Sequence, residues 1–544
     1  MRNIAENIFS RSGIIAFANA IGFTDEPCAL PANGTPPVTH LGKRGSSRCI
    51  HIRITEFDVA NLNRTARQLR THFAAESLLL LITSGDYARV CVACFNADDL
   101  CTLMLERGRI HNADVDALSE LVPRNGEVGL HLAMRHARAL DRVRVTNRFF
   151  NDFRAHRARV ADAWEGIGPR LREEREQLAL LLLSRLMFLY FLQRRGFLGG
   201  NREFFLDRLR AHFTKPAGAS FYRSVLRPLF FGVLNRRPEK RTQRAAALGA
   251  LPYLNGGLFE RHYLERRYPD LNLGDSVIRG VFEQLLERYR FTAAEGEHDL
   301  AVDPEMLGRV FEGLMADNAR HCTGTFYTPA SVVRRMVRSA FDAYLGAYPI
   351  HQASRLLREA RVLDPACGSG AFLLGALDHI SSRRSAIEGI RAAAIRAEVV
   401  ARNLHGVDLQ QDAALLCALR LWLALIPDEP ASVVRPLPNL DRRIRQGDAL
   451  TDPLDLAAEA VASPAVRAAR RTLQPLVQRY TQCDPEERPG VHRLVARRER
   501  DLSRAWLDAL HMRAREQTRE LRAQAAARDL FGAVPSSALE ARAQ

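Results

Sequence analysis

The chain has 544 residues, of which 47% are hydrophobic and 26% are charged. This composition excludes a disordered or fibrous chain and is typical of a globular protein with roughly two to four domains. The formal net charge is +16, which favours a polyanionic partner such as nucleic acid. Lysine occurs only at positions 43, 215 and 240 of this alanine-rich chain. A codon bias toward arginine therefore explains much of the charge, which gives only weak support for such a partner.

The cysteines and apolar stretches indicate the environment of the chain. Nine cysteines are scattered along it, which predicts a reducing, cytoplasmic compartment. Cys91 and Cys94 form one C-x-x-C pair inside an apolar run, and no second Cys/His pair has zinc spacing, so we expect core cysteines. Residues 1–21 lack the apolar core of a signal peptide. The longest apolar run, 178–192, is shorter than the ~20 residues that span a bilayer and predicts a buried helix.

Residues 1–112 are expected to form a small α/β unit. The stretches 49–54, 78–83 and 88–95 have the apolar patterns of strands, and a turn is indicated at 84–86 between the last two.

Residues 113–300 are expected to form a helical domain. Apolar residues have helical spacing in 115–121, 128–141 and 171–195. The stretch 251–260 contains proline and two adjacent glycines, which predict a loop.

A capped helix is predicted at the start of the third region, 301–452. Thr328 is the expected N-cap and Pro329 the first helical residue. The helix beyond has a predicted apolar face of Val332, Val333, Met336, Val337, Ala340 and Phe341.

The most informative stretch begins with an apolar strand that ends at Asp364. A turn of small residues follows, with Gly368 and Gly370, and then an apolar helical pattern. Glycines allow a ligand to approach the backbone, and a helix N-terminus directs N–H groups at it. The spacing is not the dinucleotide G-x-G-x-x-G, and the chain contains no G-x-x-x-x-G-K-[ST] phosphate loop. An acid four positions before the first glycine, followed by G-x-G, suits S-adenosylmethionine (AdoMet), which has a charged amino-acid tail and no phosphate.

Two further predicted strands, 403–408 and 444–448, also end in an acid. A carboxylate at the end of the second strand can accept hydrogen bonds from both ribose hydroxyls of a nucleotide-type ligand. Asp408 is therefore a predicted ligand-binding residue, and a role as helix N-cap is compatible with it. The helix predicted at 412–425 is expected to pack on the sheet.

Residues 453–544 form the last predicted region, an Ala/Arg-rich helical insert. Pro475 and the loop 484–490 are expected to divide it into antiparallel helices. Such helices could lie along DNA, although a solvated surface explains their charge as well.

The glycine-turn stretch 364–373, Asp-Pro-Ala-Cys-Gly-Ser-Gly-Ala-Phe-Leu, resembles the AdoMet motif of N6-adenine DNA methyltransferases. In particular, it resembles the large methylases of type IIG-like restriction-modification and phage-defence systems. The stretches 186–198, 251–260 and 324–331 are similar to segments of the same family, the last one to its motif X. The resemblance implies a cofactor pocket formed by Phe326, Tyr327, Thr328, Pro329, Asp364, Ala366, Gly368, Gly370, Phe372, Asp408 and Asp448.

The resemblance implies an α/β fold: an AdoMet-dependent methyltransferase Rossmann-like domain with an incomplete sheet, preceded by the small α/β unit and the helical domain. It also implies a site-specific, adenine-specific DNA methyltransferase that uses AdoMet and binds double-stranded DNA. In this family an Asn/Asp-Pro-Pro-Tyr/Phe loop after the fourth strand holds the flipped adenine. That tetrapeptide is absent from the 544 residues. The resemblance thus covers the N-terminal portion of the family, and no catalytic residue is predicted.

The missing tetrapeptide leaves two interpretations open. The chain is inactive alone and needs a second polypeptide that carries the catalytic loop and the target-recognition domain, or it is a catalytically dead AdoMet- and DNA-binding remnant or subunit of a defence system. In either case the strand that ends at Asp364 lacks its expected neighbour and forms an open apolar edge. Methylation of another substrate, such as protein glutamine, is disfavoured because those enzymes lack a long helical N-terminal region. The nuclease that type IIG enzymes often carry is unsupported, because no E-x-K pair stands on a predicted strand.

Overall fold

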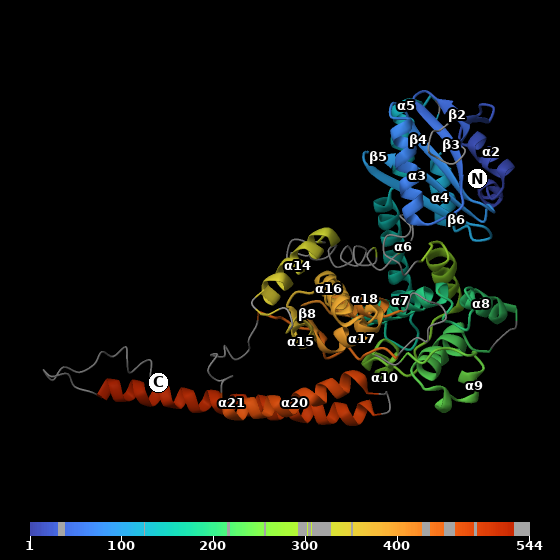
Figure 1. Cartoon of the computed structure of the whole chain (residues 1–544). Helices are drawn as coiled ribbons and strands as arrows, with labels where there is room; N and C mark the ends of the chain where they lie inside the picture. The colour runs from blue at the N-terminus through green and yellow to red at the C-terminus, as the bar shows by residue number, and fades with distance from the viewer. Residues whose placement is uncertain are drawn as a thin grey trace.

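The computed structural model describes residues 1–30, 38–124, 126–214, 218–254, 257–291, 302, 306, 328–346, 348–349, 352–426, 436–450, 463–483 and 487–526. Figure 1 shows the N-terminal sheet at one end and a helical region below it. A small parallel sheet lies beside the helical region, and two long helices project from the body.

The N-terminal sheet has six strands in the order β1-β2-β3-β4-β5-β6. All neighbouring strands are antiparallel except β3 and β4, which are parallel. The helix α3 joins this pair, because parallel neighbours need a crossover connection. The strands are β1 (Cys28–Leu30), β2 (Val38–Arg44), β3 (Ser47–Ile54), β4 (Ser77–Ser84), β5 (Arg89–Asn96) and β6 (Asp99–Glu106), and the first helices are α1 (Arg2–Asn7), α2 (Arg11–Ala20) and α3 (Val59–His72). The three predicted strands are confirmed.

The central strand β4 is apolar along its length because both faces of the sheet are covered. Leu79 and Leu81 pack in the main core, whereas Leu80 and Ile82 pack in a second cluster that includes residues of α3. On β5, Cys91 and Cys94 have exposed fractions of 0% and 3%, which confirms that both are core residues. The described residues contain no group of three metal-ligating side chains.

The helical region surrounds one long buried helix, α7 (Arg172–Arg194). By length and composition α7 could cross a membrane, but 89% of its apolar window is buried inside the protein. Its closest partners within this region are α6 (Arg142–Ala163) and α10 (Tyr263–Arg267). The helix α5 (Gly129–Ala139) instead packs on β3, β4 and β5 of the N-terminal sheet. The other elements are α4 (Asn112–Glu120), α8 (Phe204–Thr214), α9 (Gln243–Ala246), α11 (Asp275–Gly280), three π-helices (Tyr222–Leu226, Leu229–Leu234, Val281–Leu286) and two 3-10 turns (Pro238–Lys240, Gly257–Phe259). The predicted buried helix is thus confirmed.

A buried ion pair ties this region together. Arg185 of α7 donates to the two carboxylate oxygens of Glu265 at 2.7 and 3.1 Å. It also donates to the carbonyl oxygens of Leu258 and Glu260, both at 2.6 Å. The predicted loop 251–260 is therefore held against the core by an arginine whose side chain is only 2% exposed.

The second sheet consists of three parallel strands in the order β7-β8-β9. Its elements are β7 (Val362–Asp364), β8 (Leu404–Asp408), β9 (Ile444–Gln446), α14 (Ala330–Gly346), α15 (Ala353–Glu359), α16 (Ala371–Glu388), α17 (Ala392–Arg402) and α18 (Gln411–Leu423). Within the described residues β7 pairs only with β8, and its Leu363 is 62% exposed. The predicted apolar edge at the strand that ends in Asp364 is confirmed for the described residues.

The helix α14 differs from the prediction in its start and its buried face. It begins at Ala330, and the carbonyl oxygen of Pro329 accepts from the amide of Val333 at 3.0 Å. Pro329 rather than Thr328 therefore stands at the cap position. Only Val333, Val337 and Phe341 are buried, because the contact with α16 is a narrow seam; Val332 and Met336 are 44% and 53% exposed.

The two long helices are α20 (Pro464–Gln482) and α21 (Arg488–Ala526), which pack against each other. The prediction that Pro475 divides this region is wrong, because α20 continues through it. Pro475 lies on the exposed face, where water can satisfy the carbonyl group that loses its helical bond. Figure 1 shows α21 reaching well beyond the rest of the molecule.

Candidate cofactor site

The glycine turn lies between β7 and α16, at the carboxyl edge of the parallel sheet. The amide of Cys367 donates to the carbonyl oxygen of Val407 at 2.9 Å, which joins the turn to β8. Gly368 and Gly370 have φ angles of +52° and +87°, a left-handed region that favours glycine. A Cβ atom at Gly370 would lie 2.7 Å from Sγ of Cys417, whereas a Cβ atom at Gly368 would meet no atom within 4 Å. The turn is therefore packed against α18 at Gly370 and open to a ligand at Gly368.

The carboxylate of Asp408 closes the turn from the neighbouring strand. One oxygen accepts from the amide of Gly368 at 2.8 Å, and the other accepts from the amide of Gln410 at 2.9 Å. The N-cap of α18 is Gln410, so Asp408 is not the predicted helix cap. Each carboxylate oxygen has two acceptor sites, so Asp408 can still accept hydrogen bonds from a ligand.

A second carboxylate, that of Asp364, stands at the end of β7. It accepts from the amide of Ala366 at 3.2 Å. Burial raises its pKa above the ordinary value, and the nearby charge of Asp408 raises that pKa further. The two acids therefore lie close enough to repel each other, and a cation bound between them would relieve that repulsion.

The third predicted acid, Asp448, is exposed just after β9 and accepts from the amide of Leu450 at 2.9 Å. Leu450 and Leu409 have exposed fractions of 96% and 60%. The sequence analysis did not single out these two leucines. An apolar residue one or two positions after each strand-end acid is the pattern that could have identified them.

The structure brings Asp364, Ala366, Gly368 and Asp408 together through the bonds above, with Gly370 and Phe372 at the start of α16 and Asp448 on the next strand. Thr328 and Pro329 precede α14, which approaches α16 so closely that a Cβ atom at Gly375 would lie 2.7 Å from Cγ1 of Val333. Phe326 and Tyr327 lie outside the described residues.

Arg420 of α18 supports the turn from below and was missed by the sequence analysis. Its guanidinium donates to both the carbonyl oxygen and the side-chain oxygen of Ser369 at 3.0 Å. Arg420 is 4% exposed and Ser369 is 1% exposed. An arginine inside the otherwise apolar run 413–425 was the pattern that could have identified it, since such a charge must find a partner when buried.

The helical region contacts the start of α18, the helix that follows Asp408. Arg157 of α6 donates to the carboxylate of Asp412 at 3.0 Å, and Gln177 of α7 is bonded to Gln411. Both contacts reach the first turn of α18, only a few residues beyond Asp408. The long helices α6 and α7 therefore fix the position of the strand-end acid relative to the rest of the chain.

The site is suited to AdoMet on the evidence of its own residues. The open space above Gly368 admits a ligand close to the backbone, and two carboxylates at neighbouring strand ends suit hydroxyl and cationic groups. AdoMet carries both kinds of group, in its ribose and in its amino-acid and sulfonium end. Asp408 would hold the ribose and Asp364 would face the cationic end.

Comparisons with known proteins show which proteins this chain is similar to. Over 334 residues the chain is 27% identical to a putative type II restriction enzyme and methyltransferase of Methanocaldococcus jannaschii, covering 52% of this chain and 28% of the relative. It is 22% identical to the type II restriction enzyme and methyltransferase Eco57I of Escherichia coli, covering 36% and 22%. The solved type IIL restriction-modification enzyme MmeI in complex with DNA aligns with a TM-score of 0.40 and 17% identity, covering 60% and 42%.

A family model matches one segment of the chain. Residues 302–458 match the model of the N-6 DNA Methylase family. The resemblance to N6-adenine DNA methyltransferases of restriction-modification systems is therefore confirmed for the region that contains the glycine turn. The chain spans about a quarter of the length of the two curated relatives.

Proposed function

We propose that this chain carries the AdoMet-binding part of a site-specific, adenine-specific DNA methyltransferase of a restriction-modification or phage-defence system. Residues 301–452 would form its Rossmann-like AdoMet-dependent domain, with the sheet still incomplete. The observation that carries the proposal is the bond from the amide of Gly368 to the carboxylate of Asp408. It supports a single pocket built from a glycine turn and a strand-end acid.

Each residue of the pocket has a proposed task. Asp408 accepts hydrogen bonds from the ribose hydroxyls, and Asp364 lies beside the positively charged end of the cofactor. Asp448 accepts from the adenine amino group, and the exposed side chains of Leu409 and Leu450 cover the adenine ring. AdoMet, when bound, supplies an activated methyl group for transfer to N6 of adenine in DNA.

Double-stranded DNA is the proposed substrate. The net charge of +16 and the similarity to restriction-modification methyltransferases support this choice. The 544 residues contain no Asn/Asp-Pro-Pro-Tyr/Phe tetrapeptide. We further propose that a second polypeptide supplies the catalytic loop and the target-recognition domain, and that it pairs with the edge of β7, where Leu363 is exposed.

A second candidate function is that of a catalytically inactive AdoMet- and DNA-binding subunit. A methyl-transfer assay with labelled AdoMet and adenine-containing duplexes tests the proposals. We expect no incorporation by this chain alone, and incorporation at N6 of adenine once a partner with the tetrapeptide loop is added. Incorporation by the chain alone would contradict the need for a partner. If added partners bind but never restore transfer, the inactive subunit is the better description.

A further inference from the structure

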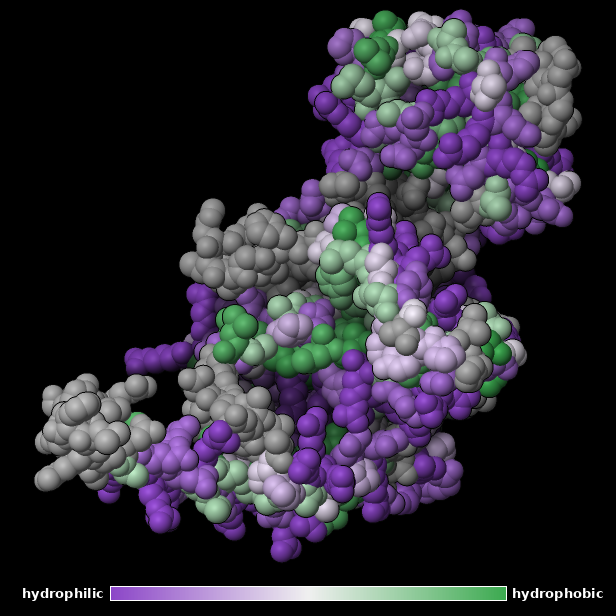
Figure 2. Space-filling view, turned by 60° about the vertical axis from the view of Figure 1, so that its left-hand side comes forward, coloured by the Kyte–Doolittle hydropathy of each residue, from purple (hydrophilic) through white to green (hydrophobic). Residues whose placement is uncertain are grey.

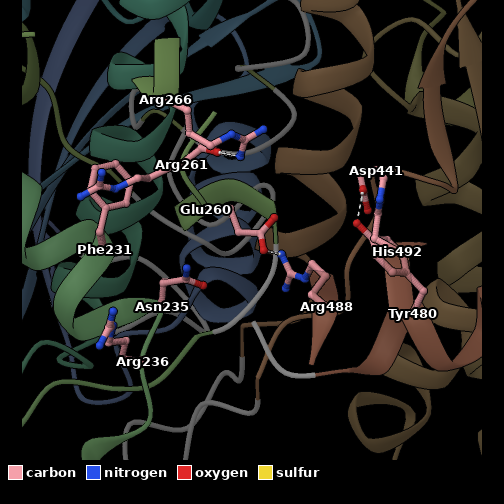
Figure 3. Close-up of a pocket in the computed structure, with 10 residues that line it drawn as sticks. All are labelled: Phe231, Asn235, Arg236, Glu260, Arg261, Arg266, Asp441, Tyr480, Arg488 and His492. Carbon is pink, nitrogen blue, oxygen red and sulfur yellow. Dashed lines mark hydrogen bonds and ion pairs between the residues drawn. The ribbon is translucent and has the colours of Figure 1, made fainter. Parts of the chain in front are cut away.

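A basic groove lies between the helical region and the long helices α20 and α21, away from the cofactor site. One cavity of about 710 Å³ is lined from both sides, by residues such as Arg261 and Arg266 on one and Tyr480 and Arg488 on the other. Figure 3 shows these side chains facing each other across the cavity. A second cavity of about 440 Å³ shares Phe231, Arg236 and Arg261 with the first. Each cavity lies in the size range of ligand sites, and the shared residues join the two into one groove that extends over both cavities.

Arginine dominates the walls of this groove. Seven arginines line the two cavities, against three acidic residues. Two of the acids already have partners within the wall: Glu260 forms an ion pair with Arg488, and Asp441 accepts from the hydroxyl of Tyr480 at 2.7 Å. The groove therefore keeps a net positive charge.

Several of the arginines are oriented by neutral groups. Arg223 donates to the carbonyl oxygen of Asp270 at 2.6 Å, and Arg227 donates to that of Pro269 at 3.1 Å. Arg266 donates to the carbonyl oxygen of Arg261 at 2.5 Å. A carbonyl oxygen fixes the direction of a guanidinium without neutralising its charge. These side chains are therefore held in place for an anion at little further entropic cost.

Other polar groups in the groove have bonding capacity left. Arg236 and Arg244 are exposed and have no ion-pair partner in the part of the chain that the structure describes. Arg261 lies over the ring of Phe231, 5.2 Å from its centroid. Planar guanidinium groups of this kind match phosphate oxygens in geometry and charge.

We propose that this groove binds phosphate groups, from the backbone of a nucleic acid or from a free phosphate compound. Asp441 precedes β9, so the groove borders the amino ends of the parallel strands, whereas the glycine turn follows their carboxyl ends. The groove is thus a separate site, and its occupancy does not require AdoMet. Its extent over both cavities and its many arginines favour a polymer backbone.

The test uses the full chain and the double variant Arg236→Glu/Arg244→Glu, which alters two exposed side chains. The matched control is Arg64→Glu/Arg67→Glu on α3, which makes the same charge change at two exposed positions of the N-terminal unit. Binding of a fluorescent duplex DNA is measured by anisotropy across a salt series, and binding of inorganic pyrophosphate by calorimetry. AdoMet binding and thermal unfolding are recorded for every protein.

We expect the groove variant to bind the duplex at least tenfold more weakly. The slope of log affinity against log salt should fall by about 2, because each phosphate contact contributes about 0.9. The control variant and AdoMet binding should be unchanged. If the groove variant binds pyrophosphate more weakly but binds the duplex as the wild type does, the ligand of the groove is a free phosphate compound. Equal affinity of wild type and groove variant for both probes would overturn the proposal, as would a wild-type chain that binds neither. If the wild-type chain does not bind AdoMet, that result would contradict the proposed function and not the phosphate groove.

Discussion

The amide of Gly368 donates to the carboxylate of Asp408 at 2.8 Å, across 40 residues of sequence. This bond fastens the turn after β7 to the end of β8. Gly368 leaves the backbone open to a ligand, and Asp408 provides hydrogen-bond acceptors. A ligand that contacts the backbone at Gly368 is therefore also close to the carboxylate of Asp408. Four of the five predictions below test parts of this arrangement.

Replacement of Gly368 by valine should abolish AdoMet binding. The left-handed φ of +52° is strained for valine, and the added side chain would enter the open space above the turn. The matched control is Gly389→Val, where φ is +67° and a Cβ atom also meets no atom within 4 Å. Both variants should lose about 1–2 kcal/mol of stability. Only Gly368→Val should lose cofactor affinity in calorimetry, and equal affinities would contradict the pocket.

Replacement of Arg420 by methionine should loosen the turn from below. The variant removes the two hydrogen bonds from the Arg420 guanidinium to Ser369, and hydrogen bonds of a charged group contribute about 1.5–3 kcal/mol to the unfolding free energy. The exposed Arg383 of α16 gives the control Arg383→Met. Urea denaturation measures both. A similar small change in the two variants would show that Arg420 does not hold the turn.

The affinity for AdoMet should fall in mild acid. Burial and the charge of Asp408 raise the pKa of Asp364 above the ordinary value, so this acid becomes protonated at a higher pH than a free aspartate. The cationic end of AdoMet binds the ionised carboxylate of Asp364. It is therefore bound at pH values above the raised pKa and released as the pH falls through that pKa. In the absence of ligand, the contribution of Asp364 to folding stability has the opposite pH dependence. This contribution falls as the pH rises from the ordinary pKa through the raised pKa, because the folded state binds the proton more tightly than the unfolded state.

Calorimetry of AdoMet binding from about pH 4 to about pH 7 measures this dependence. Asp364→Asn should bind more weakly than wild type at neutral pH and should lack the acid-side loss. The same pH profile in wild type and Asp364→Asn would show that another group is responsible.

The buried pair of Arg185 and Glu265 should be essential for the helical region. Their side chains are 2% and 7% exposed, so Arg185→Met leaves a buried carboxylate without its partner and should cost about 3–5 kcal/mol. The double variant Arg185→Met/Glu265→Met should cost less than the sum of the single variants, because it removes both charges. Urea denaturation of the two single variants and the double variant measures these costs. If the free-energy changes of the single variants add up to that of the double variant, Arg185 and Glu265 do not interact directly.

Local pattern was sufficient to predict the strands β3, β4, β5, β7, β8 and β9 and the acids at the ends of the parallel ones. The strands β4 and β5 follow from apolar runs and β3 follows from alternation, whereas β7 and β8 end directly in an acid. The partner of Arg420 could not be predicted, because Ser369 lies 51 residues away and only the packing of α18 under the turn brings the two residues together.

The two errors on helices have similar causes. Val332 and Met336 are apolar but exposed, because α14 meets α16 along a seam narrower than its apolar stripe. Pro475 lies within α20 because the face on which it stands is open to water and the opposite face packs on α21. Neither the width of a contact nor the face that a proline occupies is set by neighbours in sequence.

Titration of AdoMet into the full chain and into Asp408→Asn is the most direct test of the cofactor site. The variant keeps the shape of the side chain but removes its charge, and hydrogen bonds to a charged group contribute about 1.5–3 kcal/mol. We predict saturable binding by the wild type, at least about tenfold weaker binding by Asp408→Asn, and no change in Asp378→Asn, which alters an exposed acid of α16. Equal affinity of the wild type and Asp408→Asn, or no binding by the wild type, would contradict an AdoMet site at this turn.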